Sequence, residues 1–365
     1  MRNRPMTAHY FLLASFLTST LLSACFLLSS CTPTPRPPLT PSLLAYRFDP
    51  PAFLEYSAGL QPVQEFPFVV PANCGLNNTF AAPAGNFLAV ELNCPNGQAV
   101  LFLDVESGSV TQPVADSDSH FLAWTGDGEA AYIKVDLLGS PEIIRAYTDG
   151  ARDVLPINEF TYDLAAQPDS FDFTFTFSRG LGYGSEIYLA RHDGRIAQYL
   201  YSDQYNYISF ARFSPDGSQI AFIKTPDSQT PFTVGELWVM NADGTNPRKL
   251  ADADAGHGFA ADWSPDGTKI AFVVRENPND QAADQNSDAL VSNIYIVEVE
   301  SGILSQVTHL TQGRAETPRW SPEGNTLAFS MVINGRMNVS TTDIATGEIT
   351  QLITEPACCP VWMRK

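Results

Sequence analysis

The stretch "FSPDGSQIAF" (213–222) decides the fold of this chain, because it joins a tight turn directly to a strand. Ser-Pro-Asp-Gly suits a type I turn, in which proline presets the second position and glycine takes the last. The residues that follow alternate with the period of two that a strand requires. Asp216 is therefore interpreted as a turn residue, and Ile220 and Phe222 as core residues of the strand.

The same motif returns along the chain. "WSPDGTKIAF" (263–272) and "WSPEGNTLAF" (320–329) align with it without gaps, and weaker copies begin at residues 81, 124 and 166. Each copy is followed by a second turn, such as Asp-Gly or Ser-Gly, between two further alternating segments. Successive copies lie 42 to 57 residues apart. A repeat of this length with four strands per unit predicts an all-β fold, a β-propeller of four-stranded blades.

These units resemble the WD40-like β-propeller repeats of the TolB-type family, through the W-S-P-D-G-x-x-I-A-F core and the later Asp-Gly hairpin. The resemblance covers roughly residues 74–362 and is strongest over 210–355. The family analogy favours six blades. Strand counting favours seven, with residues 358–364 as the inner strand of a closing blade and residues 43–66 as its other three strands. Both counts stay open here, and the propeller is predicted to span residues 43–365.

One aromatic residue recurs directly before the first turn of most units. We interpret this set as packing between neighbouring blades rather than as a surface on which a ligand stacks. The set consists of Trp124, Phe213, Trp263, Trp320 and Trp362.

The N-terminus has the features of a secreted protein. Arg2 and Arg4 precede an apolar run to about residue 28, which predicts a signal peptide over residues 1–30. "LLSSC" (27–31) resembles a bacterial lipobox, which implies lipid attachment at Cys31, with Cys25 in "LSAC" (22–25) as the alternative. Residues 31–42 are rich in Pro and Thr and predict an extended tether. We therefore expect an extracytoplasmic protein that only a lipid holds to the membrane, either the outer or the cytoplasmic one.

Four further cysteines would lie in an oxidising compartment, where disulfides are expected before metal sites. Cys74 and Cys94 are equidistant from the first turn, so they face each other across a hairpin and favour a disulfide. Cys358 and Cys359 then form a vicinal pair. A link from Cys74 to either of them across the closing seam stays open as the alternative.

The composition argues against a nucleic-acid partner. The formal net charge is −19, and so acidic a surface repels phosphate backbones. The sequence contains neither G-x-S-x-G nor HExxH, which favours a protein that is not an enzyme.

Two acidic segments are weaker candidates for ligand binding. A speculative ligand site at the mouth of the channel would consist of Asp252, Asp254 and His257. No cofactor is expected, although a weak case for calcium exists at Asp280, Asp284 and Asp288.

The sequence thus predicts a non-catalytic, monomeric propeller in the cell envelope that binds or scaffolds envelope proteins, peptides or glycans. The alternative is a propeller enzyme of lyase, lactonase or hydrolase type, with its site in the central channel.

Overall fold

The computed structural model describes residues 40–115, 118–137, 140–157, 160–168, 170–227, 232–254 and 260–364. Residues 39–365 form one compact unit. Within the described ranges the only helical element is a 3₁₀ turn at Ser287–Ala289, and no helix there could cross a membrane. The predicted signal peptide, both candidate lipidation sites and all but the last three residues of the tether lie outside the described residues.

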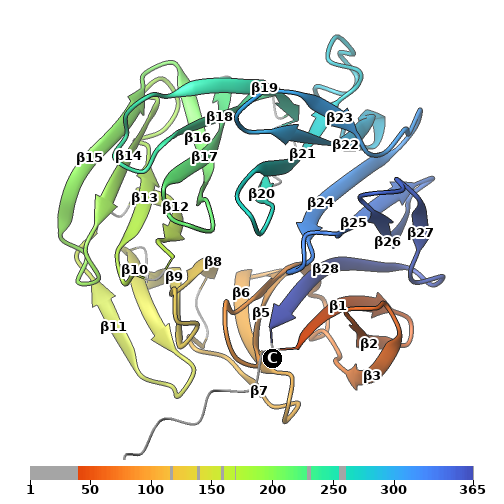
Figure 1. Ribbon diagram of the computed structural model, residues 1–365. Helices are drawn as coiled ribbons and strands as arrows, with labels where there is room; N and C mark the ends of the chain where they lie inside the picture. The colour runs from red at the N-terminus through yellow and green to blue at the C-terminus, as the bar shows by residue number, and fades with distance from the viewer. Residues whose placement is uncertain are drawn as a thin grey trace, which may run out of the picture. The chain divides into compact units, whose positions relative to one another are not determined.

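The chain forms seven four-stranded antiparallel blades. Figure 1 shows that they are arranged in a ring. The β-propeller prediction is therefore confirmed, with the seven blades that strand counting favoured. Blades 1 to 3 consist of β4 (Gly75–Ala81), β5 (Phe87–Cys94), β6 (Gly97–Asp104) and β7 (Val110–Thr111); β8 (Asp118–Trp124), β9 (Ala130–Leu137), β10 (Ser140–Tyr147) and β11 (Arg152–Leu155); and β12 (Thr161–Ala166), β13 (Phe173–Phe177), β14 (Ser185–Ala190) and β15 (Ile196–Asp203).

Blades 4 to 6 follow the same order, from the inner to the outer strand. They consist of β16 (Asn206–Phe213), β17 (Gln219–Pro226), β18 (Val234–Asn241) and β19 (Arg248–Asp254); β20 (Asp262–Trp263), β21 (Lys269–Arg275), β22 (Ser292–Glu298) and β23 (Leu304–Gln306); and β24 (Arg314–Trp320), β25 (Thr326–Ile333), β26 (Arg336–Asp343) and β27 (Ile349–Gln351). Blades 5 and 6 are joined in one sheet by a single parallel pair, Ser292 with Arg314.

The closing blade combines the two ends of the described chain. Its inner strand is β28 (Ala357–Arg364), and its outer strands are β1 (Pro41–Phe48), β2 (Pro51–Ser57) and β3 (Pro62–Pro67). β28 pairs with β1 in antiparallel register, so that Leu43 lies opposite Trp362. Closure in this way leaves the ring without an open seam, since the strands that would otherwise be edges pair with each other.

The hydrophobic core is divided among the seven interfaces between blades. Each of seven buried clusters draws its residues from two adjacent blades. In β17, Ile220 and Phe222 pack toward blade 3, whereas Ala221 and Ile223 pack toward blade 5. A strand buried on both faces has apolar residues at successive positions, which explains the continuous apolar run after the first turn.

The aromatic residues before the first turns pack between blades, as predicted. Each of the five belongs to a cluster that it shares with the preceding blade. Three indoles also donate Nε1 to a carbonyl of that blade: Trp124 to Phe80 (2.8 Å), Trp263 to Arg212 (3.1 Å) and Trp362 to Arg319 (3.2 Å). Trp320 is the exception, because its buried Nε1 has no acceptor among the described residues.

The first turns confirm that Asp216 is a turn residue. Its Oδ1 accepts hydrogen bonds from the Ser214 hydroxyl (2.6 Å) and from the Ser218 backbone N–H (3.0 Å). Gly217 has φ of 70°, a left-handed conformation that glycine adopts without strain. These hydrogen bonds lower the pKa of Asp216, so its charge is held within the turn.

The tryptophan pattern gives a matched test of the blade interfaces. Trp263 and Trp320 are 7% and 6% exposed, but only Trp263 donates a hydrogen bond. We expect Trp263→Phe to lower the free energy of unfolding by about 1–2 kcal/mol more than Trp320→Phe, because only Trp263→Phe removes a hydrogen bond between blades. Urea unfolding of the two full-length variants measures the difference. Equal losses would contradict a role for the indole hydrogen bond.

Candidate functional site

The central channel contains two adjoining chambers. A wide chamber of about 740 Å³ is lined by residues of the first turns, such as Pro83 and Pro215, and therefore opens on the turn face. A narrow chamber of about 350 Å³ lies toward the opposite face, where Leu76 and Phe48 contribute to its wall. Both volumes fall in the range of small-ligand sites, roughly 300–1,000 Å³.

The repeat places two rows of residues on the channel wall. Both rows are counted back from the residue that directly precedes each first turn, which is Phe213 in blade 4 and Trp263 in blade 5. The residue one before that position lines the wide chamber in every blade: Phe80, Ala123, Ala165, Arg212, Asp262, Arg319 and Val361. The residue three before it lines the narrow chamber: Asn78, Phe121, Asp163, Phe210, Ala260, Thr317 and Cys359. The chemistry of the channel is therefore set by these two variable positions of an otherwise regular motif.

Three residues of the narrow-chamber row have a strained backbone. Phe210, Thr317 and Cys359 have φ of 55°, 51° and 61°. The strand register shifts at each of these places, as in a β-bulge. Bulges redirect side chains, and left-handed conformations of residues other than glycine concentrate at functional sites. The channel wall is thus where the blades depart from regular geometry.

Arg212 and Asp163 form an ion pair across the boundary between blades 3 and 4. Arg212 Nη1 donates to Asp163 Oδ1 (2.9 Å) and to the backbone oxygen of Ala211 (2.7 Å). The other carboxylate oxygen of Asp163 accepts from the Ala211 N–H (2.8 Å). The Asp163 side chain is 9% exposed and that of Arg212 is 30% exposed. The pair therefore fixes two blades to each other and leaves part of the guanidinium in the channel.

Asp262 and Arg319 form a second charged group, between blades 5 and 6. Asp262 Oδ2 accepts from the Trp320 backbone N–H (2.7 Å), and Arg319 Nη1 donates to the oxygen of Pro318 (3.0 Å). Protein surrounds both side chains, although each keeps some surface in the channel. Burial raises the pKa of Asp262, and the charges of Arg319 and Arg212 act against that shift. Burial and the charge of Arg212 lower the pKa of Arg319.

Two further carboxyl groups face the narrow chamber. Glu91 accepts from Asn77 Nδ2 (2.8 Å) and from the Phe121 N–H (3.2 Å), and Glu316 accepts from Arg314 Nε (2.5 Å). Burial raises the pKa of both groups above the usual value near 4.5. Each carboxylate is thus held in place by neighbouring donors.

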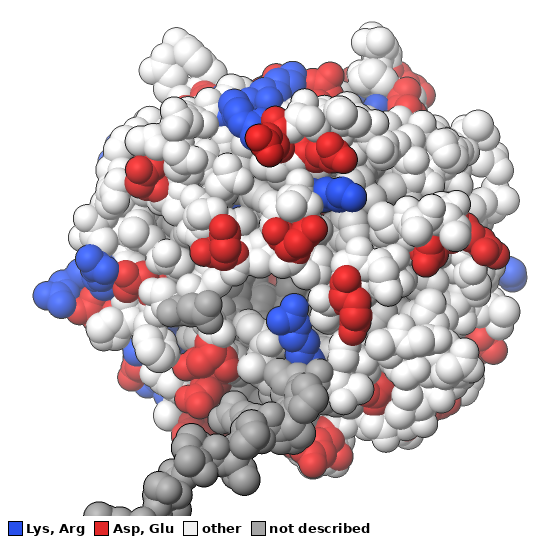
Figure 2. All heavy atoms as spheres, viewed as in Figure 1, with Lys and Arg blue, Asp and Glu red and all other residues white. Residues whose placement is uncertain are grey.

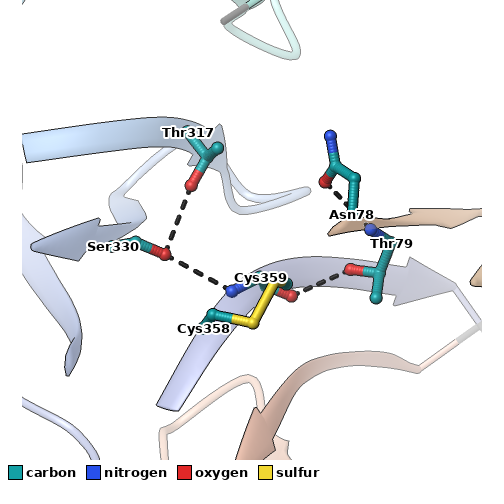
Figure 3. The surroundings of a disulfide bond; sticks show 6 residues. All are labelled: Asn78, Thr79, Thr317, Ser330, Cys358 and Cys359. Carbon is teal, nitrogen blue, oxygen red and sulfur yellow. Dashed lines mark hydrogen bonds between the residues drawn. A yellow bond between two sulfur atoms is a disulfide. The ribbon is translucent and has the colours of Figure 1, made fainter. Parts of the chain in front are cut away.

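A disulfide between Cys358 and Cys359 forms part of the narrow-chamber wall (Figure 3). The Cys359 backbone N–H donates to Ser330 Oγ (3.3 Å), and its carbonyl accepts from Thr79 Oγ1 (2.9 Å). The hydrogen bond from Thr79 joins blade 1 to the closing blade. The vicinal disulfide therefore lies at the seam of the ring.

The second disulfide joins Cys74 to Cys94, which is the pairing that the hairpin geometry favours.

The turn face has an acidic rim. The first turns of blades 2, 4, 5 and 6 carry Asp127, Asp216, Asp266 and Glu323 at equivalent positions. Figure 2 shows several acidic side chains, together with a basic one, around the hollow at the centre of the face turned to the viewer. Such a rim favours ligands with a positive charge outside the channel.

The structure does not bring the speculative mouth residues together in its described part. Asp252 lies on β19 and forms an ion pair with Lys249 (2.6 Å), whereas Asp254 is buried and accepts from Ser292. Neither aspartate is among the described residues of the channel wall. His257 lies outside the described residues, so the three-residue site stays a prediction.

The three aspartates considered for calcium are paired with arginines or backbone groups. Asp284 lies 2.9 Å from Arg275, Asp288 lies 3.7 Å from Arg314, and Asp280 Oδ1 accepts from the Ala282 N–H. Over the described residues, no three His, Cys, Asp or Glu side chains group as metal ligands would.

Sequence reasoning missed the charged residues of the channel. Arg212, Asp262 and Arg319 directly precede the aromatic residue of the repeat. Asp163 lies three residues before the corresponding position of blade 3. The signal was therefore available, as a column of the repeat in which charged residues interrupt apolar and small ones.

Comparisons with known proteins agree with the fold but do not assign an activity. No protein-family model matches the chain. An uncharacterized Agrobacterium fabrum protein is 24% identical over 62% of this chain and 72% of its own length. The Tol-Pal system protein TolB of Ruthia magnifica is 24% identical over 44% of this chain, and an uncharacterized Bacillus subtilis peptidase, YuxL, is 40% identical over 18%. The matched part of this chain spans only 35% of the length of that TolB and 9% of the length of YuxL.

The solved structures that resemble this chain in fold include both enzymes and TolB. Oligogalacturonate lyase in complex with manganese has a TM-score of 0.54 at 14% identity, covering 86% of this chain and 84% of the lyase. TolB of Acinetobacter baumannii has a TM-score of 0.50 at 18% identity, covering 86% of this chain and 78% of that TolB. A puromycin-hydrolyzing peptidase of Mycobacterium tuberculosis has 0.57 at 14% identity, covering 87% of this chain and 53% of the peptidase. These similarities establish the propeller fold.

The raised pKa of Glu91 predicts a pH dependence of stability. A carboxyl whose pKa is higher in the folded state favours folding most when it is protonated, so ionisation at neutral pH opposes folding. We expect Glu91→Gln to be more stable than wild type at pH 7–8, because Gln keeps an acceptor and Asn77 can turn its amide. The advantage should shrink as the pH falls toward 4.5. Thermal melts across this pH range measure it.

Glu355→Gln is the matched control. Glu355 accepts from the Thr354 hydroxyl, and this hydrogen bond lowers its pKa. Its replacement should therefore lose a small stabilisation at neutral pH and lose nothing at low pH, a slope of opposite sign. If Glu91→Gln behaved like Glu355→Gln, burial would not govern the Glu91 carboxyl.

Proposed function

We propose that the protein is a non-catalytic, extracytoplasmic binding module that a lipid on Cys31 holds to the membrane. It receives part of an envelope protein, a peptide or a glycan in the wide chamber, and it acts as a monomer. The observation that carries the proposal is an open chamber of about 740 Å³ on the turn face whose polar side chains are held in place by the blades. Preorganised polar groups in a concave site are what binding requires.

The way in which the channel carboxylates are bonded favours binding over catalysis. Glu91, Asp163 and Asp262 each accept a backbone N–H of the next blade. A general acid or base must release or take a proton during a reaction, and carboxylates committed to such hydrogen bonds are better suited to holding blades. The alternative is a propeller enzyme of lyase, lactonase or hydrolase type, the kind of activity that the lyase and peptidase neighbours are named for.

Three observations support the extracytoplasmic location. The N-terminal sequence has the order of a lipoprotein signal, with charge, apolar run, small residues and Cys31. The described residues contain two disulfides, which persist in oxidising compartments. TolB, a Tol-Pal system protein by name, is among the similar sequences.

A photo-crosslinking residue at the mouth tests the binding role. Pro215 is exposed and lines the wide chamber, whereas Ile303 is 59% exposed on the second turn of blade 5. With p-benzoylphenylalanine at either position of the full-length protein in cells, we expect envelope partners to be crosslinked from 215. Crosslinks from 303 alone would move the binding surface to the outer rim. Absence of crosslinks from both, together with turnover of a glycan or peptide substrate, would favour the enzyme.

The anchor gives a separate prediction. Cys31→Ser should abolish labelling by a fatty-acid analogue and release the protein from washed membranes, whereas Cys25→Ser should keep both properties. Mass spectrometry of the mature N-terminus checks which cysteine is modified. Loss of label in Cys25→Ser instead would assign the lipid to Cys25, and an unlabelled wild type would exclude the anchor.

A further inference from the structure

The charge of the wide chamber differs in sign from that of the whole chain. The chain has a formal charge of −19. The charged side chains on the described wall of the wide chamber are Arg212, Arg319 and Arg364, with Asp262 as the only acid. An excess of arginine inside a protein this acidic is a local feature that solubility does not explain, since acidic residues alone would serve that purpose.

The two inner arginines have donors to spare. Arg319 uses one nitrogen, for the neighbouring Pro318 oxygen, and Arg212 uses the same nitrogen, Nη1, for all three of its acceptors. Among the described residues the remaining N–H groups of both guanidinium groups have no hydrogen-bond acceptor. A guanidinium presents five N–H donors in a planar fork that matches a carboxylate. Both arginines line both chambers, at the level where the chambers adjoin.

We propose that Arg212 and Arg319 bind the carboxylate of a ligand that enters the wide chamber from the turn face. This inference rests on the proposed function and names the chemistry that the same site recognises. A bidentate carboxylate would satisfy the free guanidinium edges, and it would do so inside a chamber where water screens charges less than at the surface.

The acidic rim narrows the class of ligand. Asp127, Asp216, Asp266 and Glu323 lie on the first turns, outside the arginine pair. A polyanion would be repelled there, whereas a single terminal carboxylate on a neutral or basic chain would pass the rim and end at the arginines. Two sources provide this chemistry: the C-terminus of a peptide, or one uronic acid at the end of an otherwise neutral oligosaccharide.

Asp163 competes with such a ligand through its ion pair with Arg212, and Asp262 is a second internal competitor. Its charge acts on both Arg319 and Arg212, and its Oδ2 is fixed by the Trp320 N–H. Asparagine at this position keeps an oxygen for that N–H and removes the charge. The proposal therefore predicts opposite effects for two neighbouring substitutions. Arg319→Gln should weaken carboxylate binding, and Asp262→Asn should strengthen it.

Calorimetry on the full-length protein in detergent tests this prediction. The probes are a lysine-containing hexapeptide with a free C-terminus, the same peptide as its C-terminal amide, and xylotriose with and without one glucuronic acid. We expect one acid form to bind wild type at least about tenfold more tightly than its uncharged counterpart, which also identifies the source. Arg319→Gln should lose about that factor, and Asp262→Asn should gain severalfold. Arg319→Lys should recover part of the loss, because Lys keeps the charge without the fork.

Arg195→Gln is the matched control, because the Arg195 side chain is 79% exposed in the second turn of blade 3 and lines neither chamber. It should bind like wild type. Equal binding of acid and uncharged probes, no binding of either acid, or shifts of the same sign in Arg319→Gln and Asp262→Asn would each overturn the proposal. If crosslinking from position 215 persists in Arg319→Gln while carboxylate binding is absent in wild type, the binding role stands and only this inference fails.

Discussion

Every blade in this structure must bury both of its faces against its two neighbours. The seven hydrophobic clusters lie between blades, and each draws its buried residues from two of them, so no blade has a core of its own. Stability therefore depends on completing the ring. The closing blade meets this requirement by pairing β28 with β1, and the hydrogen bond from Thr79 to Cys359 then joins it to blade 1.

The same constraint creates the channel and its polar wall. Where the inner strands converge, their side chains line the chambers, and a charged side chain that is partly buried there needs a polar partner. Asp163, Arg212 and Asp262 meet this condition by bonding across blade boundaries, so that structural ties and exposed charge come from the same groups. A binding site can arise on such a wall without weakening the ring, since the side chains are already fixed by their packing partners.

Much of the fold could be predicted from residue patterns. The Ser-Pro-Asp-Gly turns, the continuous apolar runs and the aromatic residues before the turns predicted four-stranded blades that pack face to face. The hairpin geometry also favoured the Cys74–Cys94 bond. The candidate site was harder to predict. Asp252 and Asp254 drew attention as an acidic run but lie on an outer strand, whereas Arg212 and Arg319 looked like ordinary strand residues.

The sequence by itself determined the repeat, its turns and the alternation within strands, because these depend on backbone preferences and on contacts between residues close along the chain. Only the tertiary structure decided how many blades close the ring and which side chains meet at its axis. Residues 163, 212, 262 and 319 are about 50 residues apart from one blade to the next, and nothing local draws them together. They meet because seven interfaces of nearly equal geometry bend the chain into a circle, and that curvature is a property of all the blades at once.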